Sequence, residues 1–222
     1  VNAPLIIADG LTGGFMQPVP VAGKHFKSVK IAGDIAEANA MFVISHFKGH
    51  EMAGFGGAIK NLAMGCCPSQ GKKEQHAAKF VVHPDLCIGC RSCLKPCPEQ
   101  AIDMQAKKAV INPEKCVGCG ECMTVCPVKA IDIDWATELV PFIERMVEYA
   151  CGAVQGKEGQ VGYINFLTNI TPDCDCVPWS DAPIVPDIGF LASLDPVALD
   201  KACFDLVNRQ KGFESSKLAC AH

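Results

Sequence analysis

The sequence predicts an α/β protein whose α/β domain is discontinuous, because a cysteine-rich α+β module interrupts it. Two observations lead to this fold class. Short apolar runs alternate with helix-like segments before residue 80 and again after residue 134. Between them lies a duplicated segment that holds eight of the chain's 15 cysteines. We therefore expect residues 1–79 and 135–222 to share one α/β domain, and residues 80–134 to form a separate inserted domain.

The composition limits the class of protein before any motif is considered. The chain has 222 residues, and its odd number of cysteines argues against a closed disulfide framework. We therefore expect reduced thiols that serve as metal ligands in the cytoplasm. No apolar run approaches the ~18 residues of a membrane span. The net charge of -4 disfavours nucleic acid as a partner.

The amino-terminal part reads as short strands separated by turns. Apolar runs bounded by turn residues predict strands over residues 5–8, 29–32 and 41–45, with a helix over 34–40. After the inserted segment, apolar residues at helical spacing predict a helix over 137–150.

The carboxyl-terminal part continues the same alternation. We expect a strand over residues 161–167, a turn-rich loop over 171–181 and a broken strand over 184–192. A last helix is predicted from a capping Asp195 and a Pro196 suited to the first helical position, and Gly212 is expected to end it.

The central segment is an internal repeat with an offset of 29 residues. FVVHPDLCIGCRSCLKPCPEQAIDM aligns with AVINPEKCVGCGECMTVCPVKAIDI, and each copy carries C-x2-C-x2-C-x3-C-P. This run is typical of bacterial 4Fe-4S sites in which the fourth cysteine ligates the other cluster. The predicted ligand sets are Cys87, Cys90, Cys93 and Cys126 for the first cluster, and Cys116, Cys119, Cys122 and Cys97 for the second. Zinc is the alternative, but its sites use two C-x-x-C pairs with a long spacer.

Over residues 80–134 the chain resembles the two-cluster bacterial ferredoxins on the strength of these two runs. The resemblance implies electron transfer, two 4Fe-4S clusters and redox partner proteins, with the chain acting alone or as a subunit of a larger complex.

A second resemblance covers nearly the whole chain. The runs SHFKGHEMAGFGGAIKNLAMGCC, GKKEQH and PIVPDIGFLASLDPVALDKACFDLV resemble the iron-sulfur family named domain of unknown function 362. The resemblance implies an α/β domain interrupted by a two-cluster ferredoxin unit. It also implies a further α/β stretch upstream, so we expect Val1 to lie inside a longer protein.

A more distant similarity concerns the cofactor-anchoring segment of the lactate racemase family. His50, Gly54, Phe55, Gly57 and Lys60 fall in the order of that segment, and His76 follows at a comparable distance. By this similarity His50 would carry a proton, Lys60 would anchor a cofactor and His76 would bind its metal. His50 and Lys60 are therefore the candidate catalytic residues.

The glycines of this segment admit two interpretations. Gly54, Gly56 and Gly57 precede a predicted helix, where backbone N–H groups could hold an anion or cofactor with Lys60 as the counter-charge. A tight strand-to-helix turn would require the same glycines.

Seven cysteines lie outside the repeat. Cys174 and Cys176 share a turn-rich loop and, with Cys66 and His76, could hold a third metal or cluster. A redox-active pair or no special role are the alternatives.

The sequence thus favours an iron-sulfur electron-transfer protein or redox subunit. The alternatives are a cluster-dependent enzyme with a site near His50, Lys60 and His76, and an adaptor whose clusters are structural.

Overall fold

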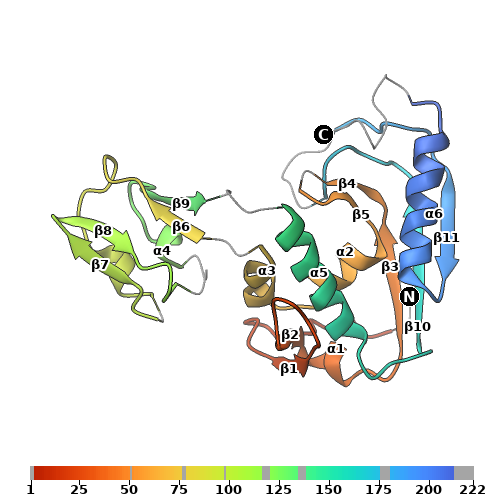
Figure 1. Cartoon of the computed structure of the whole chain (residues 1–222), viewed down its shortest axis with the longest axis horizontal. Coiled ribbons are helices and arrows are strands. Elements are labelled where there is room, and N and C mark those ends of the chain that lie inside the picture. Colours follow the sequence, from red (N-terminus) through yellow and green to blue (C-terminus); the bar gives the residue numbers. More distant parts are fainter. Residues whose placement is uncertain are drawn as a thin grey trace. The chain divides into compact units, whose positions relative to one another are not determined.

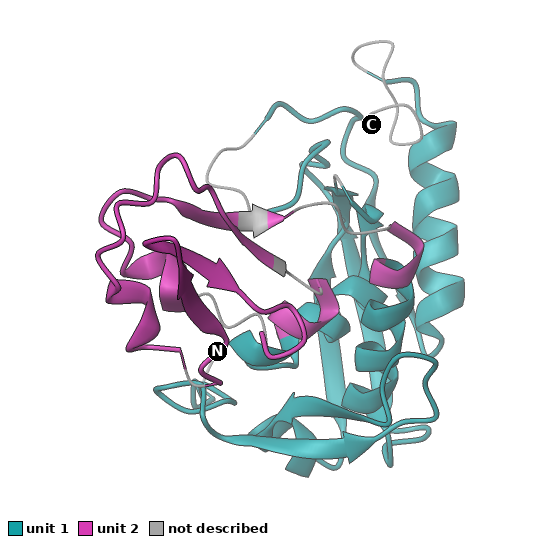
Figure 2. Cartoon of the chain, turned by 60° about the vertical axis from the view of Figure 1, so that its left-hand side comes forward, with its two compact units in different colours: residues 1–71, 143–222 teal, residues 72–142 magenta. Residues whose placement is uncertain are grey.

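The computed structural model describes residues 3–50, 52–76, 79–97, 99–116, 121–134, 139–175 and 181–212. The fold is mixed α/β, with several small sheets and six α-helices in these ranges (Figure 1). The chain divides into two compact units, which Figure 2 colours separately. The discontinuous unit combines residues 1–71 and 143–222, and the central unit spans residues 72–142. No helix in the described part is long and apolar enough to cross a membrane.

The discontinuous unit is built on a three-stranded sheet in the order β11-β10-β3. Strand β3 (Met41–His46) runs parallel to β10 (Val161–Leu167), and β11 (Gly189–Ser193) is antiparallel to β10. Residues from both ends of the sequence therefore share one sheet. Helices α2 (Ala58–Gly65) and α6 (Pro196–Arg209) pack against it.

The two faces of this sheet differ in burial. Val43, Tyr163 and Leu167 are buried. The alternate positions carry exposed aromatic and aliphatic side chains, including Phe42, Ile44, Phe166 and Phe190. Because side chains alternate between the faces of a strand, the buried set marks the face that the two helices cover.

Smaller elements complete the discontinuous unit. Strands β1 (Met16–Pro20) and β2 (Ser28–Ala32) form one antiparallel hairpin, and β4 (Lys48–His50) and β5 (Gly54–Gly56) form another. The remaining helices are α1 (Gly33–Glu37), α3 (Ser69–His76) and α5 (Leu139–Val154), of which α3 and α5 contain the two boundaries between the units.

Several predicted elements are confirmed, and two expectations are wrong. Gly212 does not end the last helix, because α6 ends at Arg209 and the backbone of the capping Gln210 is already extended. The strand over residues 161–167 and the Asp195 cap are both present, and the Asp195 carboxylate accepts bonds from the N–H groups of Val197 and Ala198. Residues 5–8 form no strand, and the Leu5, Ile6 and Ile7 side chains are 58 to 98% exposed. The strand that pairs with β2 is instead β1, whose two prolines hid it from the apolar pattern.

The central unit repeats its backbone at the offset of 29. Strand β6 (Lys79–Val82) pairs with β9 (Ile131–Asp134), and β7 (Ile102–Gln105) pairs with β8 (Lys108–Ile111). Each sheet therefore joins one strand from each copy of the repeat. The 3-10 helix η1 (Ser92–Leu94) and helix α4 (Glu121–Thr124) occupy matching positions in the two copies.

Candidate functional site

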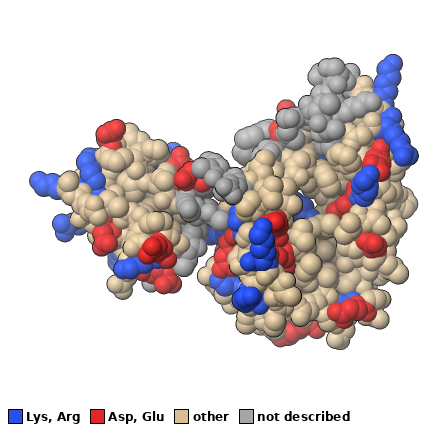
Figure 3. All heavy atoms as spheres, in the orientation of Figure 1, with Lys and Arg blue, Asp and Glu red and all other residues tan. Residues whose placement is uncertain are grey.

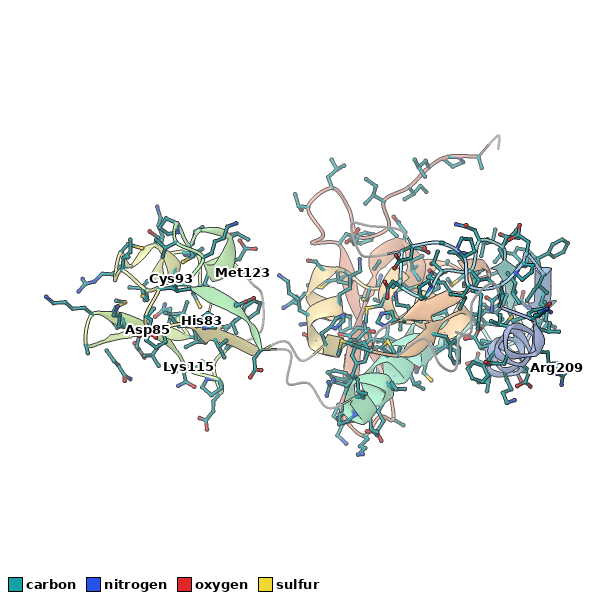
Figure 4. The ribbon with its side chains drawn as sticks, turned by 90° about the horizontal axis from the view of Figure 1, so that it is seen from above. His83, Asp85, Cys93, Lys115, Met123 and Arg209 are labelled. Atoms are coloured by element: carbon teal, nitrogen blue, oxygen red, sulfur yellow. The ribbon has the colours of Figure 1, made fainter. Side chains whose placement is uncertain are left out.

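The four cysteines of the first predicted set line a single pocket in the central unit. Cys87, Cys90 and Cys93 come from the first copy of the repeat, and Cys126 comes from the second. The pocket measures about 330 Å³, including the space at its open mouth. Apolar residues complete its lining, among them Ile88, Met104, Val128 and Ile131. Figure 4 labels Cys93 on η1 and Met123 on the neighbouring α4.

Backbone geometry in the first loop explains how three closely spaced cysteines reach one pocket. Gly89, between Cys87 and Cys90, has a φ of +72°, and a Cβ at this position would lie 2.4 Å from the carbonyl oxygen of Lys107. Only glycine fits such a turn without displacing the backbone opposite. The ammonium of Lys108 donates to the Cys87 carbonyl at 2.6 Å and fixes the same loop from the other side.

Backbone amides donate hydrogen bonds to cysteine sulfurs of both predicted sets. Ala101 N donates to Cys97 Sγ and Ala130 N donates to Cys126 Sγ, each at 3.2 Å. These two bonds are equivalent in the repeat, because both partners are separated by 29 residues. Ala109 N lies 3.5 Å from Cys87 Sγ. Such donors stabilise negative charge on sulfur, which is the form in which cysteine binds a metal.

The electrostatics of the pocket favour a cationic group among the thiols. Burial raises the pKa of Cys93, and the neighbouring thiols of Cys90, Cys87 and Cys126 raise it further. These side chains therefore oppose one another's ionisation. A metal centre relieves that opposition, because coordination deprotonates a thiol outright.

Three cysteines of the second predicted set are described, and all three pack in the core of the central unit. Cys122 is buried, and Cys97 and Cys116 are partly buried against the same cluster. The fourth, Cys119, lies outside the described residues.

Within the described ranges, no three His, Cys, Asp or Glu side chains are grouped to hold one metal ion. A single zinc ion draws each sulfur to about 2.3 Å, whereas a cluster of several irons separates its ligands farther. One metal ion and a multi-iron cluster therefore require different separations of the same four thiols.

A second polar cluster lies at the sheet edge of the discontinuous unit. Strands β3 and β10 are parallel, so their carboxyl ends meet, and ligands of α/β sheets commonly bind at such an edge. The loop after β10 carries Asp175, whose carboxylate lies 2.9 Å from both His46 Nδ1 and Lys48 Nζ. Partial burial raises the Asp175 pKa, but the hydrogen bonds from His46 and Lys48 outweigh it and hold the pKa below its usual value.

Two predicted site residues meet at this edge. Lys60 Nζ, on α2, donates to the sulfur of Cys174 at 2.8 Å, and Cys174 is buried. His50 lies on β4, and its Nδ1 accepts the backbone N–H groups of Met52 and Ala53 at 3.1 Å each. The His50 ring thus supports the turn between β4 and β5.

The other members of the predicted third site are distributed differently. Cys66 is buried beside the end of α2, and burial raises its pKa to about 11. His76 belongs to the central unit, where its ring packs on Phe142 with the ring centres 4.8 Å apart. Cys176 lies outside the described residues.

The structure adds a residue that the sequence analysis missed. Asp200 on α6 is buried, and its carboxylate accepts the N–H groups of Ala58 at 2.7 Å and Ile59 at 3.0 Å. A Cβ on Gly57 would lie 2.3 Å from the same carboxylate. Asp200 thus occupies the start of α2, where the glycine segment had suggested an external anion, and this favours the structural interpretation of Gly57.

Helical spacing could have indicated the burial of Asp200. It follows Leu199 and precedes Cys203 and Val207 on one face of α6, and all four side chains are buried. A carboxylate on such a face requires hydrogen-bond partners, which α2 supplies.

The fold and the sites define a mixed α/β protein with a duplicated, cysteine-lined unit. A family model matches residues 1–205, and the chain belongs to the family described as Domain of unknown function (DUF362). No curated protein matches the chain.

Proposed function

We propose that this chain is an iron-sulfur electron-transfer protein, or a redox subunit, whose central unit is a ferredoxin-like insertion with two 4Fe-4S clusters. The observation that carries the proposal is the pocket lined by Cys87, Cys90, Cys93 and Cys126. The fourth member comes from the other copy of the repeat, as cross-ligation by this cysteine run requires.

Each cluster would be held by cysteines from both copies of the repeat. The Cys87, Cys90, Cys93 and Cys126 set would hold one, and the Cys116, Cys119, Cys122 and Cys97 set the other. A 4Fe-4S cluster supplies one-electron transfer when it is bound. The N–H donors of Ala101 and Ala130 would stabilise the ligand sulfurs, and the apolar pocket lining would limit contact with water.

The remaining chemistry of the chain agrees with a thiol-based metalloprotein. None of the 12 cysteines among the described residues forms a disulfide bond. Free thiols persist in a reducing compartment, which supports a cytoplasmic location. The discontinuous unit would then serve as the body through which redox partner proteins or other subunits are engaged.

Reversible reduction tests this function directly. Protein purified without oxygen should lose visible absorbance on addition of dithionite, give an EPR signal from reduced clusters, and recover its absorbance on reoxidation. Bound clusters that dithionite cannot reduce would contradict electron transfer and would support the adaptor alternative, in which clusters only hold the fold.

One observation favours a second candidate, a cofactor site in the discontinuous unit. The Lys60–Cys174 hydrogen bond places an amine and a thiol together beside a sheet edge. Intact-mass measurement and nickel quantification test this candidate. A bound group should be present in the native chain, absent in Lys60→Met and retained in Lys201→Met, which changes an exposed lysine on α6. A native chain without an adduct or nickel would contradict it.

A further inference from the structure

The two copies of the cysteine repeat carry different charges at several matched positions, among them Leu86 and Lys115, and Lys95 and Thr124. The two positions between the second and third cysteines together differ by two charges. Between the second and third cysteines, the first copy has Arg91 and Ser92, and the second copy has Gly120 and Glu121. The first pair supplies a positive charge and a hydroxyl donor. The second supplies a negative charge and no hydroxyl. The two predicted cluster sites are therefore electrostatically unequal, although their cysteine spacing is identical.

The first pair lies directly at its site. Arg91 and Ser92 both line the pocket of the Cys87 set. Ser92 hydrogen-bonds the Cys90 thiol through both its hydroxyl and its backbone N–H. These bonds place positive partial charge against a ligand sulfur.

The backbone at Arg91 is left-handed, as it also is at Lys107 and Lys129 of the same unit. The φ of Arg91 is +65°, in the left-handed region that favours glycine, and its counterpart in the second copy is Gly120. A non-glycine residue in this region costs of order 1 kcal/mol and is often found at functional sites. The first copy retains an arginine where glycine would be less strained.

The second pair, Gly120 and Glu121, carries a negative charge where the first pair carries a positive one. Glu121 is exposed at the first position of α4, directly before the ligand candidate Cys122. On the face seen in Figure 3, acidic and basic residues are both present on the surface of the central unit. The unit therefore has no single sign of charge that would obscure the local difference between the two cluster sites.

We propose that these two pairs give the cluster held by the Cys87 set the higher reduction potential, so that it receives the first electron. The inference rests on the proposed two-cluster function. Reduction adds a negative charge, which a nearby cation and hydrogen-bond donors stabilise and a nearby carboxylate destabilises. An electron entering at the Cys116 set would then move to the Cys87 set, which gives electron flow through the chain a direction.

A potentiometric titration of the full chain, followed by EPR and visible absorbance, measures both potentials. We expect two resolved one-electron steps in the native protein. Their separation should correspond to at least about a tenfold preference for one cluster, or 59 mV for a one-electron couple. Arg91→Gly/Ser92→Glu should lower the higher potential, and Glu121→Ser should raise the lower one.

Asp103→Ser is the matched control, since it also removes one carboxylate from the central unit. Asp103 is exposed on β7 next to Met104, which lines the pocket, so the two side chains point to opposite faces of the strand. Both potentials should stay unchanged in this variant.

Three outcomes would overturn the inference: a single unresolved step in the native protein, a lowering of the lower potential by Arg91→Gly/Ser92→Glu, or no effect of Glu121→Ser. Iron and sulfide are measured in every sample to keep the two proposals apart. Fewer than eight irons in the native chain would contradict the two-cluster function itself, whereas eight irons with equal potentials would contradict only the inequality of the sites.

Discussion

The side-chain amide of Asn165 on β10 donates a hydrogen bond to the carboxylate of Asp200 on α6 at 2.7 Å, and both side chains are buried. Asp200 also accepts two backbone N–H groups at the start of α2. One carboxylate thus joins the central strand of the sheet to the two helices that cover it.

We expect Asp200→Asn to destabilise the discontinuous unit by about 3 kcal/mol. The carboxylate faces three donors, and an amide in its place turns an NH₂ group towards one of them, leaving a buried donor without an acceptor. Urea denaturation measures the loss, and the amides of Ala58 and Ile59 should exchange hydrogen faster. Asp205→Asn, an exposed change on the same helix, serves as the control. Equal stability of the two variants would show that the buried carboxylate contributes little.

Gly89→Ala should impair the loop of the first cysteine set. The added Cβ would lie 2.4 Å from the Lys107 carbonyl oxygen, in a residue whose φ is already +72°. Gly159→Ala provides a close control, because Gly159 has the same φ but open space around it. Gly159→Ala should lower the free energy of unfolding only by the strain of a left-handed alanine, about 1 to 2 kcal/mol. Iron content should fall in Gly89→Ala alone, and an equal iron content in both variants would contradict the steric argument.

Alkaline pH should weaken the discontinuous unit through Cys66. Burial raises the pKa of this thiol from 9.0 to about 11. Below pH 9 the Cys66 thiol is protonated in both the folded and the unfolded state, so its contribution to the free energy of unfolding is fully present. As pH rises from 9 towards 11, the unfolded chain ionises first and stability falls, by up to about 3 kcal/mol. The fall in unfolding free energy between pH 8 and pH 10.5 should be smaller in Cys66→Ala. An identical pH dependence in both proteins would contradict a raised pKa.

The sequence predicted the repeating parts of the fold better than the parts held by long-range contacts. The offset of 29 aligns β6 with β8 and β7 with β9, because both copies carry the same local pattern. The apolar run at residues 5–8 failed as a strand, since a strand also needs a pairing partner, and β2 pairs with β1 instead.

The candidate sites show the same difference between local sequence patterns, which can be predicted, and long-range contacts, which cannot. The four cysteines that spacing groups into the first predicted ligand set line one pocket, and their binding of a cluster stays a prediction. The bond between Lys60 and Cys174 joins residues 114 positions apart, and spacing within one segment carries no information about such a contact. The carboxylate at Asp200 was missed for the same reason, because its partners on α2 are more than 140 positions away.

Iron and acid-labile sulfide content test the central claim most directly, measured in the anaerobically purified chain and in two variants. We expect about eight irons and eight sulfides per native chain, and the same content in Cys151→Ser, which removes an exposed cysteine outside the repeat. Cys126→Ala should lose about half of both, because it removes one ligand of the Cys87 set alone. Stoichiometric zinc in place of iron, or an unchanged iron content in Cys126→Ala, would contradict the account.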